Sequence, residues 1–213
     1  TYSWVGPNGF ASTAQNPLIN TSTTNMSGTY SVTVFDNIGC GATAVTNVTV
    51  NPLPNPSIIA NNTFGCAPLC ATFTVTNSMA LQSVVWSVNG GNGANGNTYE
   101  NCFNAAGLFT VTAGVTDING CSNTTSYLVD VYPIPVADFN FAPIKPIVNH
   151  DEVTFTDASH SATIAAWNWY FYSTAANTSN AQHPTFYYPE AGTYPVTLVV
   201  KSDKGCVDTI TKI

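Results

Sequence analysis

The chain has 213 residues, of which 44% are hydrophobic, 12% aromatic and only 7% charged, and its formal net charge is −7. With four Lys and Arg residues in all, it has no basic surface for phosphates, which excludes nucleic acid or an anionic membrane surface as a partner. Its hydrophobic content excludes a disordered chain, and no apolar run approaches the roughly 20 residues of a membrane helix. Abundant Thr, Ser and Asn beside β-branched and aromatic residues predict an all-β fold.

One sequence pattern occurs three times: a glycine, an aromatic strand and a final Gly-Cys. The copies are GTYSVTVFDNIGC at 28–40, GLFTVTAGVTDINGC at 107–121 and GTYPVTLVVKSDKGC at 192–206. Their spacing is too long for a solenoid unit and is typical of tandem small domains. We therefore predict three units, at 1–52, 53–133 and 134–213, joined by stiff proline-bearing linkers at 51–56 and 132–137.

Alternating apolar residues within each repeated strand predict one inward-facing side. They are Tyr30, Val32 and Val34, then Phe109, Val111, Ala113 and Val115, then Tyr194, Val196, Leu198 and Val200. A tryptophan strand precedes each copy, with Trp4, Trp86, and Trp167 with Trp169. A tryptophan opposite a Tyr or Phe strand is typical of the core of a small two-sheet sandwich. Further strands are expected at 71–76, 97–103, 122–132, 153–157 and 184–188.

The two end units are expected to be incomplete. The first begins at its Trp4 strand, and the third stops at Ile213, soon after its Gly-Cys, so we interpret the chain as a window on a longer protein. Pro195 lies in the third repeated strand and has no N–H for a ladder. We expect it at the strand's first pair or at a bulge.

The third unit resembles a PKD domain, a small immunoglobulin-like β-sandwich common in bacterial surface proteins. PTFYYPEAGTYPVTLVV at 184–200 follows the family's pattern closely. WYFYST at 169–174 keeps Trp169 and Phe171 of the family's Trp-Asp-Phe-Gly-Asp-Gly turn but loses both glycines and both acids. The resemblance therefore covers the core residues and not the turn.

The other two units resemble relatives of this domain. The second carries WSVNGG at 86–91 and GCAP at 65–68, and the first is similar to the Ig-like repeats found beside PKD domains. Similar tandem arrays occur in very large surface adhesins of gliding bacteria that use type IX secretion. The resemblance thus implies an extracellular or cell-surface protein.

Six cysteines with no CxxC spacing predict disulfides and an oxidising compartment. Four lie in the second unit and allow three pairings, which sequence alone leaves open: Cys66, Cys70, Cys102 and Cys121. The GCAP…NGC arrangement of similar domains implies Cys66–Cys121, and Cys70 and Cys102 then lie on strands able to face each other. Cys40 and Cys206 have no partner within their own units. We interpret Cys206 as a free thiol, with a disulfide to another chain as the alternative.

No catalytic site is expected. TDASH at 156–160 has the residue types of a hydrolase triad, but on one polar turn they do not converge from different elements. NGGNGANGN at 89–97 lacks the Lys-Ser/Thr ending of a phosphate loop, which favours a hairpin loop. His150, His160 and His183 are too scattered to indicate a metal site.

Three aspartates near the Gly-Cys turns are candidate calcium ligands. Asp36, Asp117 and Asp203 recur at the same edge of each unit, where linker carbonyls would complete the coordination of Ca²⁺. The favoured interpretation is a turn aspartate whose side chain caps backbone amides. No other cofactor is expected.

Two surface features carry binding and modification hypotheses. If Trp169 and Phe171 point inward, alternation turns Tyr170 and Tyr172 outward, beside Val199 and Pro195, as a patch for a sugar or a protein. Asp208-Thr209-Ile210 resembles the short O-glycosylation motif of secreted proteins of the bacteria named above, with Thr209 as the acceptor.

The leading functional hypothesis is a non-catalytic run of sandwich modules that forms the stalk of a secreted or surface-anchored bacterial protein, with an adhesive surface as a second role of the same modules. Its partners would be other repeats of the same protein, surface polysaccharide or neighbouring subunits. One alternative is an ancillary carbohydrate-binding module of a secreted hydrolase. The other is a surface filament in which a neighbour donates the missing edge strands.

Overall fold

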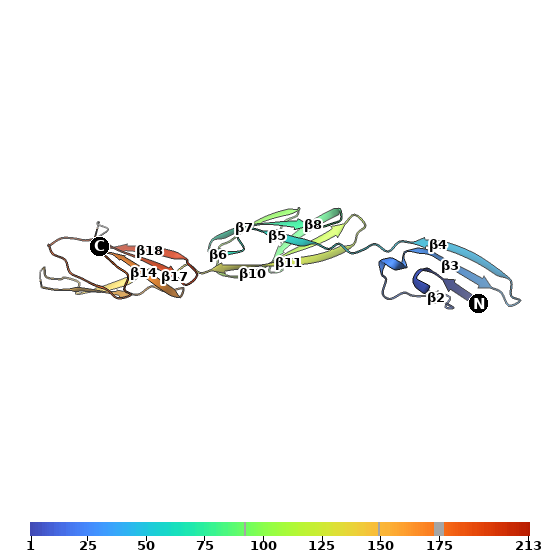
Figure 1. The fold of residues 1–213 in the computed structure, drawn as a ribbon, viewed down its shortest axis with the longest axis horizontal. Helices are drawn as coiled ribbons and strands as arrows, with labels where there is room; N and C mark the ends of the chain where they lie inside the picture. The colour runs from blue at the N-terminus through green and yellow to red at the C-terminus, as the bar shows by residue number, and fades with distance from the viewer. Residues whose placement is uncertain (92, 149, 173–176) are drawn as a thin grey trace. The chain divides into compact units, whose positions relative to one another are not determined.

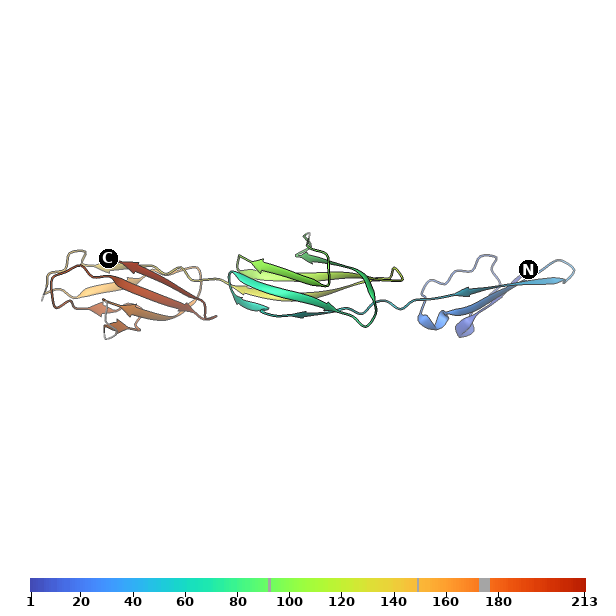
Figure 2. The same cartoon turned by 90° about the horizontal axis from the view of Figure 1, so that it is seen from above.

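The computed structural model describes residues 1–91, 93–148, 150–172 and 177–213. Within these ranges the chain forms β-strands and two short 3₁₀ turns, as Figures 1 and 2 show. None of the described residues forms a helix with the length and apolar character to cross a membrane. The predicted all-β class is confirmed.

The first unit is a single antiparallel sheet with strand order β2-β1-β3-β4. Its elements are β1 (Tyr2–Val5), η1 (Pro7–Gly9), β2 (Ala11–Ser12), η2 (Thr24–Met26), β3 (Gly28–Phe35) and β4 (Gly41–Val48). Strands β3 and β4 pair in continuous register from Gly28↔Val48 to Phe35↔Gly41. The hydrogen-bonded ladder is therefore regular over the whole repeated strand.

The sandwich core expected for the first unit is not formed. Tyr30 is buried, with its hydroxyl donating to the Met26 carbonyl at 2.9 Å, but Val34 is 41% exposed. Trp4 is half-buried, and its indole Nε1 donates to the Ala14 carbonyl at 3.0 Å. The prediction was wrong here because no second sheet among the described residues packs against this face.

The second unit is a two-sheet sandwich. One sheet has the order β6-β11-β10-β8 and the other β5-β7-β9. The strands are β5 (Ser57–Ala60), β6 (Phe64–Cys66), β7 (Leu69–Thr76), β8 (Leu81–Val88), β9 (Thr98–Phe103), β10 (Gly107–Asp117) and β11 (Ser122–Tyr132). Trp86 on β8 and Phe73 on β7 are fully buried, as are Val111 and Val115 on the repeated strand β10, which neighbours β8 in its sheet.

The third unit is also a two-sheet sandwich, with orders β12-β13-β16 and β15-β14-β17-β18. The strands are β12 (Phe139–Ala142), β13 (Val153–Asp157), β14 (Ile164–Tyr170), β15 (Thr178–Ser179), β16 (Thr185–Phe186), β17 (Val196–Ser202) and β18 (Val207–Lys212). Trp169, Phe155 and Leu198 meet in its buried core, as the alternation pattern predicted for Trp169 and Leu198. Strand β17 begins at Val196, which pairs with Lys212, so Pro195 directly precedes the first pair and does not occupy it, and it interrupts no ladder.

The segments that connect the three units contain no strand among the described residues. No strand is assigned between Val48 and Ser57 or between Tyr132 and Phe139, and the expected boundaries near 53 and 134 fall in these connections. Residues 173 and 174 of the WYFYST turn and residue 92 of the NGGNGANGN loop lie outside the described residues. The chain is thus a series of tandem immunoglobulin-like β modules, the first a single sheet and the next two sandwiches.

Candidate functional site

The three Gly-Cys turns share one hydrogen-bonding geometry. The residue four positions before each cysteine accepts a side-chain bond from the cysteine N–H: Asp36 Oδ1 at 2.8 Å, Asp117 Oδ1 at 2.9 Å and Ser202 Oγ at 3.0 Å. The same residue donates its own N–H to the cysteine carbonyl in every case, at 3.0, 2.9 and 2.8 Å. The glycine has a φ of 83° to 88° in all three turns, a left-handed conformation that favours glycine. The repeated Gly-Cys therefore encodes one closed turn.

In these turns the side chains of Asp36 and Asp117 accept hydrogen bonds from backbone amides. Asp36 and Asp117 cap backbone amides, which is the favoured interpretation, whereas Asp203 is offset by one position from them, and Ser202 takes the capping place. Among the described residues, no group of three or more His, Cys, Asp or Glu side chains is placed to hold a metal ion. The other carboxylate oxygen of Asp117 is buried without a hydrogen-bond partner in the structure.

The disulfides differ from the pairing that the resemblance implied. Cys70 and Cys102 are bonded, and they sit opposite each other on β7 and β9 as expected. Cys66 is bonded to Cys206, 140 residues further along the chain, and not to Cys121. Cys121 is a half-buried free thiol.

Cys206, expected to be unpaired or linked to another chain, is therefore bonded within its own chain. Its partner Cys66 lies in the preceding unit, and the sequence prediction considered only partners within the same unit. Cys40 remains free and exposed. No local sequence signal separates this pair from the other pairings, because Cys40 and Cys121 also follow a glycine.

The Cys66–Cys206 disulfide joins strand β6 of the second sandwich to the turn between β17 and β18 of the third. Cys66 on β6 pairs in parallel with Tyr132, the last residue of β11, and the Ala67 N–H donates to the Tyr132 carbonyl at 3.0 Å. The ammonium of Lys204, in the turn that carries Cys206, lies 5.5 Å from the Tyr132 ring centroid, which is within cation–π range. The contact between Lys204 and Tyr132 therefore lies beside the Cys66–Cys206 disulfide as a second, noncovalent link.

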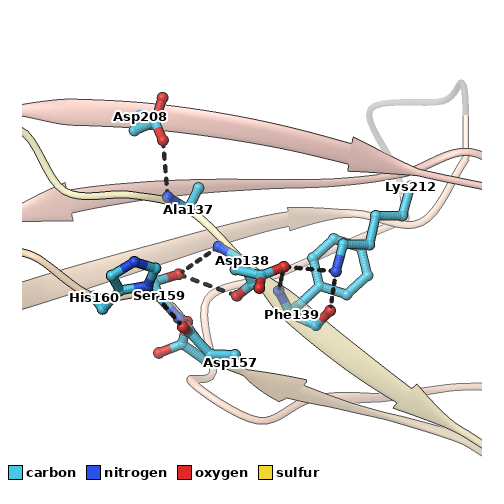
Figure 3. Close-up of polar contacts among 9 residues, drawn as sticks. Ala137, Asp138, Phe139, Asp157, Ser159, His160, Asp208 and Lys212 are labelled. Carbon is cyan, nitrogen blue, oxygen red and sulfur yellow. Dashed lines mark hydrogen bonds and ion pairs between the residues drawn. The ribbon is translucent and has the colours of Figure 1, made fainter.

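The start of the third sandwich is held by polar contacts that no sequence motif indicated. Figure 3 shows Lys212, at the end of β18, reaching both the carboxylate of Asp138 at 2.6 Å and the Phe139 carbonyl at 2.5 Å. Asp208 on the same strand accepts from the Ala137 N–H at 2.8 Å. The hydrogen bond from Lys212, followed by that from the Phe139 N–H, holds the pKa of Asp138 below its ordinary value. The last strand is therefore tied to the segment that opens its own domain.

The TDASH residues are part of this region and do not form a triad. Ser159 Oγ donates to the Asp138 carbonyl at 3.2 Å, and its N–H donates to Asp157 Oδ1 at 3.0 Å. Burial raises the pKa of Asp157, but hydrogen bonds from Ser159, Trp167 and Gln182 outweigh it and lower the pKa overall. The ring of His160 is exposed and contacts the Ala158 carbonyl at 3.4 Å. These polar groups hold together a turn, which is the structure that their position after a strand predicted.

The remaining histidines and the glycine-rich loop also have structural roles. His183 Nδ1 accepts from the Asp157 N–H at 3.1 Å, and His150 Nδ1 lies 2.7 Å from Asp151 Oδ1. In the described part of the loop at 89–97, the Gly96 carbonyl accepts from the Trp86 indole at 2.7 Å. This carbonyl therefore caps the core tryptophan. The loop joins β8 to β9, which lie in different sheets, so these two strands do not form the expected hairpin.

The tyrosine patch predicted on the third sandwich is only half formed. Tyr170 is 42% exposed, opposite Thr197 in the ladder, while Val199 is half-buried. Tyr172, predicted to point outward, is partly buried in an aromatic cluster with its ring centroid 5.3 Å from that of Tyr194. The prediction failed because β14 ends at Tyr170, and strand alternation does not extend past the end of a strand.

This aromatic cluster is defined by Tyr172, Phe186, Tyr188 and Tyr194. The rings of Tyr188 and Tyr194 stack with centroids 4.5 Å apart. Burial, with the neighbouring tyrosines, raises the pKa of Tyr188 to about 12. The cluster is a satellite of the core and not an open stacking platform.

Thr209, the expected glycosylation acceptor, is exposed on β18 and lies opposite Val199. Its neighbours Asp208 and Ile210 are half-buried on the opposite side of the strand. The motif therefore lies inside a paired strand, and the carboxylate of its aspartate, Asp208, accepts a hydrogen bond from the Ala137 N–H.

The comparisons with known proteins assign part of the chain. Residues 138–213 match the PKD domain family. The PKD1 domain of Epp from Vibrio anguillarum is 30% identical, with 37% of this chain and 88% of that chain covered and a TM-score of 0.32. A search of curated proteins finds no match.

Two multidomain structures also align over most of the chain. A Ca²⁺-stabilised adhesin by which an Antarctic bacterium binds ice is 11% identical, covering 86% of this chain and 55% of that chain, with a TM-score of 0.40. The titin I-band fragment I67–I69 is 12% identical, covering 99% and 86%, with a TM-score of 0.43. The family match rests on the third sandwich, and residues 138–213 of this chain therefore belong to the PKD domain family.

Proposed function

We propose that this chain is a non-catalytic, load-bearing segment of an extracellular bacterial surface protein. Modules of the PKD and immunoglobulin-like kind are typically non-catalytic. Two disulfides fit an oxidising compartment outside the cytoplasm. The parent protein that we propose is a large adhesin of a gliding bacterium with type IX secretion, for which the motif resemblance is the support.

The observation that carries this proposal is the covalent link between two neighbouring sandwiches. When the chain is pulled at its ends, tension passes from Cys66 through the sulfur bridge to Cys206. The segment between them, which contains β7 to β17, lies inside a closed loop and cannot be extended while the bridge is intact. The two sandwiches are thus protected from lengthening under force, which suits a segment that bears load.

The test is single-molecule extension of the 213-residue chain held at its two ends. The bridge closes 140 residues, of which Cys70–Cys102 separately closes 32. Under oxidising conditions the Cys206→Ser variant should therefore reach a fully extended length about 370 Å greater than the unmodified chain, at 3.3–3.6 Å per residue.

The matched control is Cys121→Ser, which removes a cysteine from the same kind of turn without touching the bridge. It should extend no further than the unmodified chain. Equal extended lengths for the unmodified chain and Cys206→Ser would show that tension is not carried by the bridge and would overturn the proposal.

A further inference from the structure

The third sandwich contains a cavity that a load-bearing role does not use. Its volume is about 410 Å³, within the range of about 300–1,000 Å³ that is typical of small-molecule sites. It lies where described residues of two connecting segments, 143–152 between β12 and β13 and 187–195 between β16 and β17, meet the core. The cavity is therefore formed within one module.

Aromatic rings form much of the wall of this cavity. They belong to Phe139, Phe141, Phe155, Tyr188 and Tyr194. The ring centroid of Phe155 lies 6.0 Å from that of Phe139 and 6.1 Å from that of Phe141. Rings of this kind offer apolar surface to the body of a ligand, and their electron-rich faces attract cations.

Apolar side chains at the opening of the cavity are left in contact with water. Ile144 is 80% exposed, Ile147 62% and Val148 40%, and all three line the cavity. Neighbouring exposed apolar side chains are typical of a surface that binds a partner or a ligand. A ligand with an apolar body would cover them.

The one basic side chain among the described lining residues is already neutralised. Figure 3 shows the ammonium of Lys212 beside Phe139, and it lies 5.0 Å from the centroid of that ring. The same ammonium is 2.6 Å from the Asp138 carboxylate. Lys212 therefore shows that a cation is accommodated beside these rings, and its own charge is balanced.

Two carboxylates also line the cavity, one from each connecting segment. Asp151 accepts from the Ile147 N–H at 2.9 Å and lies 2.7 Å from His150 Nδ1, and these contacts lower the pKa of its carboxyl group. Glu190 is exposed, and only its backbone carbonyl accepts a hydrogen bond among the described residues, from the Tyr194 hydroxyl at 2.8 Å. The Glu190 carboxylate is thus an unpaired negative charge beside an aromatic cavity.

We propose that this cavity binds a small organic cation, whose aromatic or alkyl body enters between the rings and whose ammonium group pairs with Glu190 and Asp151. Cation–π attraction and the two carboxylates act on the same end of such a ligand. An anion of the same size meets two like charges instead. The net charge of −7 on the chain favours the approach of a cation as well.

The test is a titration of the isotope-labelled chain, followed by backbone amide chemical shifts. The probes are benzyltrimethylammonium as the cation, benzenesulfonate as the anion and benzyl alcohol as the neutral ligand. The cation should shift the amides of Val153, Tyr188 and Glu190 and bind about tenfold more tightly than the anion. No shift at these amides, or equal affinity for the two ions, would overturn the proposal.

A charge variant separates a specific site from general attraction to an acidic protein. Glu190→Gln removes the unpaired charge with little change of shape, so it should weaken benzyltrimethylammonium binding severalfold and leave benzyl alcohol binding unchanged. The matched control is Asp203→Asn, the same loss of charge at an exposed residue of this sandwich that does not line the cavity. Equal weakening in the two variants would count against the site.

A second variant ties binding to the cavity itself. Ala191 is exposed and lines the cavity, so Ala191→Trp places a large side chain there without disturbing the core. It should remove the shifts caused by benzyltrimethylammonium and by benzyl alcohol, and shifts that persist would show that the probes bind elsewhere. These readouts do not involve the Cys66–Cys206 bridge, so this proposal and the load-bearing role can fail separately.

Discussion

The first sheet and the third sandwich contain the same repeated strand in two different surroundings. Strand β3 pairs with β4 over eight residues and β17 pairs with β18 over six, so both ladders are regular. On β3 the buried apolar residue is Tyr30, whereas on β17 Val196, Leu198 and Val200 are all buried. The comparison teaches that the strand pattern specifies pairing and an inward face, while burial requires a second sheet.

The largest expected contrast is between the tryptophans of the two regions. Trp169 is fully buried, and Trp169→Ala should cost about 3–5 kcal/mol of the free energy of unfolding of the third sandwich. Trp4 is half-buried on an uncovered face, and Trp4→Ala should cost about 1 kcal/mol. Hydrogen exchange of peptides from β17 and β3 measures both local opening free energies. Equal losses of free energy for Trp169→Ala and Trp4→Ala would contradict the claim that, of these two regions, only the third sandwich has a covered core.

A smaller effect on stability is expected from the burial of Tyr188 in the third sandwich. The pKa of Tyr188 is raised to about 12, so the folded state holds this proton more tightly than the unfolded chain, whose pKa is 10.0. The stabilisation is therefore complete below pH 10 and is lost as the pH rises towards 12.

The variant Tyr188→Phe should lose less stability over this alkaline range than the unmodified protein. Urea midpoints of the third sandwich measured below and above pH 10 give the difference. Tyr170→Phe, which removes the hydroxyl of an exposed tyrosine in the same sandwich, should keep the alkaline loss of the unmodified protein. If both variants behave alike, the alkaline loss does not come from Tyr188.

The smallest expected effect is the acid sensitivity that Lys212 confers. The pKa of Asp138 is lowered by its bond with Lys212, so the stabilisation is present above the ordinary value of 3.8 and is lost as the pH falls below it. Lys212→Met should flatten this acid dependence in urea denaturation of the third sandwich. The control is Lys201→Met, which replaces an exposed lysine on β17. It should leave the dependence of stability on acid pH unchanged.

Much of the fold was predictable because strands are encoded locally. The strands expected at 122–132 and 153–157 are observed with the same bounds, and Trp169 and Leu198 face the core as alternation predicted. Tyr172 was placed on the wrong side because the rule of alternation holds only within a strand. Its rotation into the aromatic cluster depends on Tyr188 and Tyr194, which come from a later segment.

The candidate site was much less predictable. The sequence shows that the three turns are alike, and the capping roles of Asp36 and Asp117 follow from a short-range pattern. It does not show that Cys66 meets Cys206, because the bond joins the end of one module to a turn of the next across 140 residues. A pairing chosen from within one module was therefore wrong.

By itself the sequence determined the all-β class, the repeated strand, its inward face and the closed Gly-Cys turn, since side-chain alternation and turn residues act over a few positions. Only the tertiary structure decided which faces are covered and which cysteines meet. Both depend on where separate sheets and turns come together in space, and the spacing of residues along the chain does not contain that information.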